Sequence, residues 1–172
     1  VASLDADDVL ALRKLEQMRV EYETMVEGLE RWIHRDTWYH TADGAREMVP
    51  SHSKSRAARA IQRAWRRETC MTHESGESVH SLTLDSVPLG DLPVIIADFS
   101  HVAVLQMRGV GASAGLNTFL RNFPRLGTLE LSGNGLTRTP QAIEDMSALR
   151  HLDLSENRIE LTERSDPEFG NN

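Results

Sequence analysis

A repeat of 23 residues near the C-terminal end constrains the fold more than any other feature of the sequence. The stretch "GTLELSGNGLTRTP", residues 127–140, is echoed by "RHLDLSENRIELT", residues 150–162. Sliding one over the other aligns four pairs of similar side chains: Leu129 with Leu152, Leu131 with Leu154, Asn134 with Asn157, and Leu136 with Ile159. A period of roughly 20 to 50 residues is typical of solenoids and related arrays.

The same pattern extends upstream in steps of 23 or 24 residues. Apolar triplets recur at Val79, Leu82 and Leu84, at Val102, Leu105 and Met107, and at Leu126, Leu129 and Leu131. A second apolar set follows each triplet: Leu92, Ile96 and Phe99; Leu116, Leu120 and Phe123; then Ile143 and Met146. Spacing by two predicts a short strand with one buried face, and spacing by three and four predicts a helical or irregular return. Each unit is therefore predicted to form one coil of a solenoid.

Two asparagines mark the turns that follow the strands. Asn134 and Asn157 are predicted to be structural turn residues, whose side-chain amides bond backbone groups left unpaired there. Val87 and Val110 occupy the equivalent positions in the first two units. With strand, asparagine turn and return, the units resemble the leucine-rich repeat family. The resemblance implies an α/β fold, a short solenoid with parallel strands on its concave side. A βαβ protein with coincidental leucines is the alternative, which the sustained register disfavours.

The front of the chain carries a different apolar pattern. Residues 5–34 predict a long helix, with acidic residues near its start and a seam that steps by three and four: Leu15, Met18, Tyr22, Met25, Leu29 and Trp32. Residues 35–52 interrupt this pattern and are expected to connect the helix to a second one.

A second helix is predicted over residues 54–69, with Ser53 or Ser55 as its N-cap. Its apolar face comprises Ala57, Ala58, Ile61, Ala64 and Trp65, and arginines cover the opposite face. Glutamates on the first helix complement these arginines: Glu16, Glu21, Glu23, Glu27 and Glu30. We expect the two helices to form a hairpin that caps the first coil, which would otherwise leave apolar side chains in water.

These patterns divide the chain into four parts. Residues 1–72 form the helical hairpin cap, residues 73–78 a polar linker, and residues 79–165 three and a half leucine-rich units. Residues 166–172 abandon the apolar pattern, which leaves open that they derive from a cloning site. Because no capping element follows the coil that stops near Leu161, we expect exposed leucines there and a surface for self-association. The first residue is not Met, so the chain is expected to be a piece of a larger protein.

Composition narrows the classes of partner. The formal charge of −7 disfavours a nucleic acid or an anionic membrane as partner. A single cysteine, Cys70, excludes an internal disulfide. No apolar run approaches the roughly 20 residues of a membrane-spanning helix, and the first residues do not form a classical signal peptide.

Two stretches contain residues typical of binding or metal sites. "AIQRAWRRET", residues 60–69, begins like an IQ motif, so calmodulin-type binding through the basic helix at 54–69 is an alternative function. Cys70 and His73 have a spacing that some zinc sites use, but a structural site needs further ligands that the sequence does not supply. We therefore predict no catalytic residue, no cofactor and no metal in this chain, with Cys70 as a thioester nucleophile kept as the rival hypothesis.

The predicted strands place polar residues on the concave surface. Residues between the buried leucines point outward, so equivalent positions stack into columns. The predicted partner-binding residues are Thr83, Asp85, Gln106, Arg108, Thr128, Glu130, Ser132, His151, Asp153 and Ser155. Solenoids use such surfaces to bind proteins, and simple solvation is the alternative.

The order of the parts supports a closer resemblance. A helix ending in "LERWI", the basic "AIQRAWRRET", and repeats running from "LTLDSVPLGDLPVIIADF" to "LRHLDLSENRIELTERS" resemble the leucine-rich region of bacterial effectors with a novel E3 ligase (NEL) domain. The resemblance implies that the parent protein is secreted into host cells and transfers ubiquitin through a cysteine in a separate C-terminal catalytic domain. It implies that this piece recognises a host protein as substrate and contacts that absent domain. A stand-alone leucine-rich repeat binding protein is the other alternative.

Overall fold

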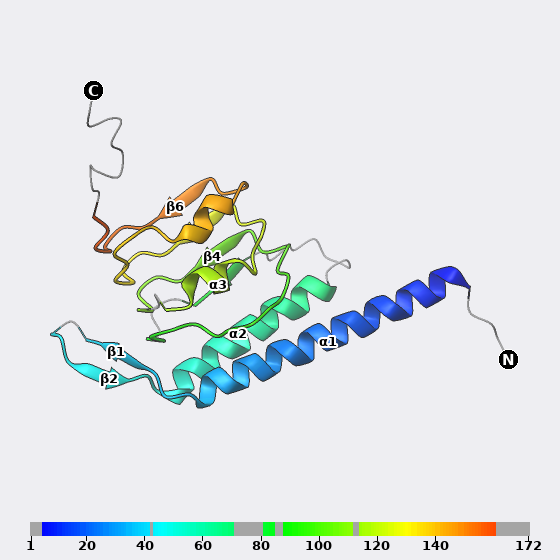
Figure 1. The fold of residues 1–172 in the computed structure, drawn as a ribbon, viewed down its shortest axis with the longest axis horizontal. Helices are drawn as coiled ribbons and strands as arrows, with labels where there is room; N and C mark the ends of the chain where they lie inside the picture. Colours follow the sequence, from blue (N-terminus) through cyan, green and yellow to red (C-terminus); the bar gives the residue numbers. More distant parts are fainter. Residues whose placement is uncertain (1–4, 42, 71–80, 85–87, 112–113, 161–172) are drawn as a thin grey trace, which may run out of the picture.

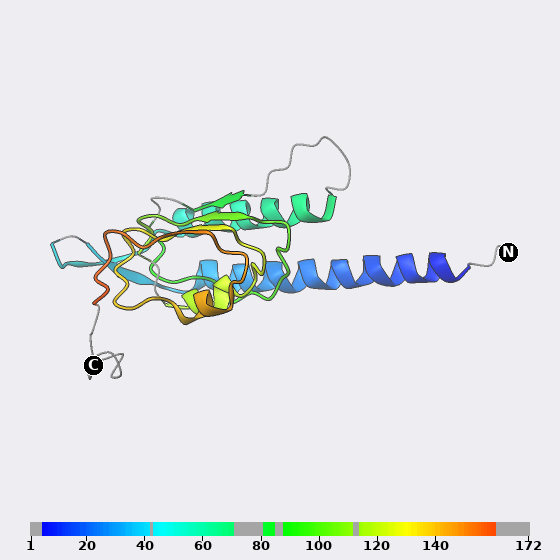
Figure 2. The ribbon, with the colours of Figure 1, turned by 90° about the horizontal axis from the view of Figure 1, so that it is seen from above.

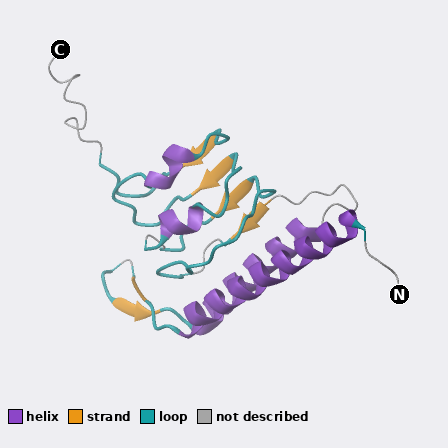
Figure 3. Cartoon of the chain, turned by 45° about the vertical axis from the view of Figure 1, so that its right-hand side comes forward, coloured by secondary structure: helices purple, strands orange, loops and turns teal. Residues whose placement is uncertain are grey.

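Two helices precede a four-stranded parallel sheet in the computed structural model, which describes residues 5–41, 43–70, 81–84, 88–111 and 114–160 (Figures 1 and 3). The helix pair comprises α1 (Ala6–His34) and α2 (Ser51–Cys70), joined by the strands β1 (Trp38–His40) and β2 (Arg46–Met48). The sheet has the order β3 (Ser81–Thr83), β4 (Val104–Gln106), β5 (Thr128–Glu130) and β6 (His151–Asp153). The predicted fold class is confirmed: an α/β molecule with a helix pair and then a sheet consistent with a short leucine-rich repeat array.

The repeat register sets the strand pairing. Leu82 lies beside Leu105, Leu105 beside Leu129, and Leu129 beside Leu152, all in parallel. The return segments cover the other side of the coils and include α3 (Leu116–Leu120) and the 3₁₀ helix η1 (Gln141–Asp145). Three phenylalanines of the first two returns fill the space between the layers: Phe99, Phe119 and Phe123 are each fully buried. Phe123 stacks on Phe99 with ring centroids 4.9 Å apart.

One core residue in the first return differs from the prediction. Ile96 is 77% exposed, whereas its neighbour Ile95 is 2% exposed and belongs to the core. Residues 93–99 are not helical, so alternate side chains point inward and Ile95 and Phe99 share the buried side. The three- and four-residue spacing assumed for this return was therefore wrong, although it holds for α3.

The last described coil is less covered than the others. Leu152 in β6 is 39% exposed, compared with full burial of Leu129 at the equivalent position in β5. Leu154 and Ile159 are partly buried. This exposure agrees with the expectation for the last coil. The predicted residues Val79, Asp85, Val87 and Leu161 lie outside the described residues.

Asparagine side chains connect successive turns. Asn134 is buried, and its Nδ2 donates to the carbonyls of Met107 and Leu131 while its Oδ1 accepts from the N–H of Val110. The turn at Val110, which lacks an asparagine, therefore takes its hydrogen bond from the next coil. Asn157 repeats the arrangement one coil later, accepting from the N–H groups of Asn134 and Leu136.

Helix α1 begins where its acidic residues predict. Asp5 is the N-cap, and Asp5 and Asp8 form a reciprocal capping box, which satisfies donors at the helix start. The predicted seam is buried only in the second half of the helix, at Met25, Leu29 and Trp32. Leu15 is 60% exposed, because α2 is shorter than α1 and leaves the first half of α1 projecting beyond it (Figure 2).

Helix α2 buries the predicted apolar face, including Ala57, Ala58, Ile61, Ala64 and Trp65. Its predicted start was wrong by three residues, since the helix begins at Ser51 and Ser53 lies inside its first turn. The predicted complementarity with the glutamates of α1 is also replaced in part. Glu16 and Glu23 pair with Arg19 on their own helix, and Arg66 of α2 donates to the hydroxyl of Tyr22.

A buried lysine closes the helix pair. Lys54 is 1% exposed, and its Nζ donates to the carbonyls of Trp32 and Arg35 and to Oγ1 of Thr37. The first carbonyl lies in the last turn of α1 and the second at its C-cap, where a helix has carbonyls that lack the usual intrahelical partners. Burial lowers the pKa of Lys54.

Asp91 fastens the helix pair to the first coil. Its carboxylate accepts from Nε1 of Trp32 at 2.8 Å and forms an ion pair with Arg35. The backbones also come close, because a Cβ placed on Gly28 would lie 2.7 Å from the carbonyl oxygen of Val94. The helix pair thus covers one end of the solenoid, as a cap does.

Candidate protein-binding surface

The outer face of the sheet, which we call the strand face, carries the predicted polar columns. Its central column contains Thr83, Gln106, Glu130 and Asp153, which are aligned by the strand register. Oγ1 of Thr83 donates to Oε1 of Gln106 at 2.9 Å, and Nε2 of Gln106 donates to Oε1 of Glu130 at 3.1 Å. The column is therefore a chain of hydrogen bonds that crosses three strands.

Two further columns flank the central one. The register aligns Thr128 with His151 on one side, in line with Ser81 and Val104. Arg108, Ser132 and Ser155 follow the strands on the other side, and the N–H groups of Gly109 and Gly133 bond the carbonyls of Ser132 and Ser155. Asp85, the first member of that column, lies outside the described residues. Nine of the ten predicted binding positions therefore fall on described residues, and the alternation of the strands places them on one face.

Opposite charges meet between two columns. Nε of Arg108 lies 3.6 Å from Oε1 of Glu130, the same oxygen that accepts from Gln106. This pair was not predicted from the sequence, although opposite charges on neighbouring strands, two positions apart, are within reach of long side chains. The pair gives the strand face a fixed pattern of positive and negative charge.

At the last strand, Asp153 bonds within its own coil. Its Oδ1 accepts from Oγ of Ser155 at 2.6 Å and from the N–H of Ser155 at 2.9 Å. These hydrogen bonds, with a smaller contribution from Arg108, lower the pKa of Asp153. The carboxylate is therefore ionised near neutral pH and held in one orientation.

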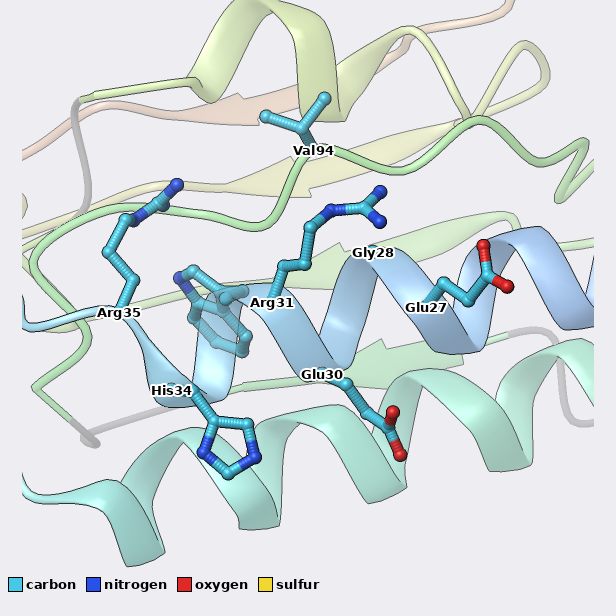
Figure 4. Close-up of a pocket in the computed structure, with 8 residues that line it drawn as sticks. Glu27, Gly28, Glu30, Arg31, His34, Arg35 and Val94 are labelled. Atoms are coloured by element: carbon cyan, nitrogen blue, oxygen red, sulfur yellow. The ribbon is translucent and has the colours of Figure 1, made fainter.

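A groove lies where α1 meets the first coil. It is an open groove of about 840 Å³ lined by Glu27, Gly28, Glu30, Arg31, Trp32, His34, Arg35 and Val94. Figure 4 shows Arg31 and Arg35 extending toward the Val94 segment, with His34 and Glu30 pointing away from it. Arg35 already forms an ion pair with Asp91, and the titratable side chains of the groove point in different directions. The described lining residues therefore do not converge on a common ligand or reaction centre.

The hypotheses of calmodulin-type binding and of a site at Cys70 and His73 concern α2 and the residues that follow it. Ile61 is fully buried and Trp65 is 7% exposed, so the apolar face that a calmodulin-type partner would grip is occupied by the core. The side chain of Cys70 and the whole of His73 lie outside the described residues. Within the described ranges, no group of three His, Cys, Asp or Glu side chains is arranged to hold a metal. In the same ranges, none of the helices combines the length and the apolar character needed to span a bilayer.

Comparison with known protein families finds one leucine-rich repeat in the chain. The family model for the leucine-rich repeat matches residues 148–172. The chain therefore contains a leucine-rich repeat. The match includes β6, and its last part, residues 161–172, lies outside the described residues. Neither the curated proteins nor the solved structures gave a match. A leucine-rich repeat is in general a protein-binding module, so the family suggests a protein partner.

Proposed function

We propose that the strand face of this module binds a protein partner. The observation that supports this most is the aligned polar column from Thr83 to Asp153, bonded across three of its strands. Side chains of the strand face that are already held in place lose little conformational entropy when a partner binds, which lowers the free-energy cost of association. Arg108 beside Glu130 adds a charge pattern that favours one orientation of the partner.

The strand face suits a protein better than a small molecule. Its polar groups are spread along a sheet whose strands are about 4.8 Å apart, rather than converging in a pocket. Glu130 and Asp153 are half-buried, so they contact neighbours while still presenting oxygens to solvent. Such a surface matches the polar, hydrogen-bonding character of protein interfaces that form and dissociate.

A matched pair of variants tests the proposal. The first replaces four residues of the strand face by alanine: Gln106, Arg108, Glu130 and Asp153. The control replaces four exposed residues of the return side, with the same residue types: Gln141, Arg121, Glu144 and Asp145. Each immobilised protein is incubated with cell lysate, and the bound proteins are quantified by mass spectrometry. We expect the strand-face variant to lose partners that the wild type and the control both retain. Identical sets of bound proteins for all three would contradict the proposal.

We further infer a role for the module as the substrate-recognition part of a larger bacterial NEL-type effector that is secreted into host cells. The support is the order of parts, a basic helix after a long helix and then the repeats, which resembles those effectors. The coding sequence beyond residue 165 tests it. Further repeats and a Cys-containing helical domain are expected there, and a stop codon would leave a stand-alone binding protein.

On this proposal the ubiquitin-transfer chemistry lies outside the chain. Cys70 is the last residue of α2 and precedes the repeats, whereas the resemblance implies a catalytic domain that follows them. Incubating the chain with a charged ubiquitin-conjugating enzyme, beside a Cys70→Ser variant, is expected to give no transfer that depends on Cys70. A thioester lost only in the variant would instead make Cys70 the nucleophile.

A further inference from the structure

The first part of α1 is uncovered: residues 6–17 are all exposed, whereas Met18 packs against the core. It projects past the end of α2 (Figures 1 and 2), and its apolar side chains face solvent, with Leu10 63%, Leu12 53% and Leu15 60% exposed. A helix of this length without tertiary packing is only marginally stable in water. A second surface that covers these leucines would stabilise it.

One series of residues along this half is arranged symmetrically. Taken in steps of three and four, the series reads Asp5, Asp8, Leu12, Leu15, Arg19 and Tyr22. Steps of three and four place the five side chains from Asp8 to Tyr22 on one side of the helix, and Asp5 precedes them as the N-cap. Acidic residues lie at one end, two leucines in the middle and a basic residue toward the other end.

The far end of this series gains a second positive charge from α2. The guanidinium of Arg66 donates to the hydroxyl of Tyr22 at 2.9 Å and lies 5.8 Å from its ring. Arg19 is held over its own helix by Glu16 and Glu23 and keeps a 56% exposed side chain. The end around Tyr22 thus carries two guanidinium groups, with Glu16 and Glu23 beside Arg19, and the opposite end carries the exposed carboxylates of Asp5 and Asp8.

We propose that α1 pairs with α1 of a second copy of this chain, antiparallel, along the series from Asp5 to Tyr22. A two-fold axis between Leu12 and Leu15 brings each Leu12 against the partner copy's Leu15. The same axis brings Asp8 opposite Arg19, and Asp5 opposite Tyr22 with its bound Arg66. A two-fold interface requires a surface that is complementary to itself, and this series meets the requirement in both apolar contact and charge.

A second copy accounts for the series better than a different partner does. An unrelated apolar partner would explain the leucines but not the acidic and basic ends at equal distances from them. The solenoids would lie at opposite ends of the paired helices, because each follows the C-terminal half of its own α1 (Figure 1). The strand faces would therefore remain open to a protein partner.

Concentration-dependent association of the full chain tests the proposal. Sedimentation equilibrium is expected to show a monomer–dimer equilibrium for the wild type. Leu12→Glu and Leu15→Glu should each raise the dissociation constant at least about tenfold, because the seam then holds unpaired carboxylates at its centre. Leu10→Glu is the matched control, since Leu10 is equally exposed on α1 but outside the series, and it should leave the constant unchanged.

Charge exchange tests the register. Asp8→Arg and Arg19→Asp should each weaken the homodimer, because like charges then face each other twice. Mixing these two variants should form a heterodimer, and combining both changes in one chain should restore the homodimer. Asp7→Arg controls for the altered charge at the helix N-terminus, because Asp7 lies in the same turn but outside the series.

Three outcomes decide the matter. Dimers that weaken with the leucine variants and recover on charge exchange support the seam. A chain that remains monomeric up to about 100 µM overturns the proposal, since it leaves no association of even moderate affinity. A dimer that is insensitive to every change on α1 also overturns it, and points instead to the exposed edge at β6.

Discussion

The helix pair and the solenoid are held together in opposite ways. In the solenoid, the turn asparagines repeat the same hydrogen bonds one coil apart, as Asn134 and Asn157 do. In the helix pair, the decisive contacts occur once: Lys54 on the end of α1, and Asp91 on Trp32 and Arg35. A substitution at one asparagine therefore also affects the hydrogen bonds of the neighbouring coils. A substitution at Lys54 or Asp91 affects a contact that has no equivalent elsewhere in the helix pair.

The largest effect is expected inside the ladder. Asn134→Ala leaves the N–H of Val110 and the carbonyl of Met107 without the Asn134 amide, both in the buried core of the coils, whereas the carbonyl of Leu131 keeps the amide of Asn157. We expect a loss of about 3 to 5 kcal/mol in the free energy of unfolding, from the two buried backbone groups left unpaired and the loss of the Asn134 packing. Chemical denaturation measures it.

Asn157→Ala is the matched control one coil later. It removes the same kind of bonds, but at a partly exposed position where water can replace them, so we expect about 1 to 2 kcal/mol. Equal losses at the two sites would show that burial along the ladder does not decide the strength of these bonds.

A smaller loss of folding free energy is expected when Lys54 of α2 no longer bonds the C-terminal end of α1. Lys54→Met keeps the length of the side chain but leaves the carbonyls of Trp32 and Arg35 and the hydroxyl of Thr37 without their donor. Because the methionine also relieves the burial of a charge, we expect a net loss of about 2 to 3 kcal/mol. Thermal unfolding followed by circular dichroism measures it.

Lys14 provides the control for this change, as an exposed lysine in the projecting half of α1. Lys14→Met should alter the unfolding free energy by less than about 0.5 kcal/mol, as surface substitutions do. If the two methionine variants were equally stable, the hydrogen bonds of Lys54 would contribute nothing to the free energy of unfolding.

Asp91 tests how firmly the two regions are joined. Asp91→Ala removes the acceptor of the Trp32 indole N–H and the ion pair with Arg35, so we expect a loss of about 2 kcal/mol. Amide hydrogen exchange should show faster exchange in the last turns of α1 and around Leu92, with the strands β4 and β5 unaffected. Faster exchange throughout the solenoid would mean that the regions form one cooperative unit.

The smallest effect concerns the strand face. Ser155→Ala removes the side-chain hydrogen bond that contributes most to the lowered pKa of Asp153, so that pKa should rise toward its ordinary value. The stabilisation that accompanies a lowered carboxyl pKa is present above the unfolded-state pKa and is lost as the pH falls through the folded-state value. The variant should therefore lose less stability on acidification than the wild type. NMR titration of the carboxyl carbon measures the pKa, and an unchanged value would remove Ser155 as its cause.

The contrast between the regions also explains what could be predicted from sequence. The strands and their register were predictable, because Leu82, Leu105, Leu129 and Leu152 recur at fixed spacing and lie side by side. The strand-face columns followed from the alternation of these strands. The hydrogen bonds along the central column and the pairing of Arg108 with Glu130 were not predicted, although the opposite charges on neighbouring strands were a usable signal for the pair.

The contacts of Lys54 and Asp91, which occur once, have no repeating pattern in the sequence from which they could be predicted. Lys54 and Trp32 are 22 positions apart, and Trp32 and Asp91 are 59 positions apart, so no spacing rule connects them. The connection between the helices forms the hairpin of β1 and β2, where only a break was expected. Ile95, and not Ile96, lies in the core because residues 93–99 are extended. This segment runs close to α1 at Gly28, and a contact between such distant residues leaves no local pattern in the sequence.

Binding at the strand face is the central claim, and site-specific photo-crosslinking tests it most directly. A benzophenone amino acid is placed at Gln106, in the middle of the polar column, or at Glu144, on the exposed return side. After irradiation in cell lysate, we predict covalent adducts with a protein from the Gln106 position and none of the same mass from Glu144. Adducts that are equal at both positions, or that form only at Glu144, would contradict the strand face as the binding surface.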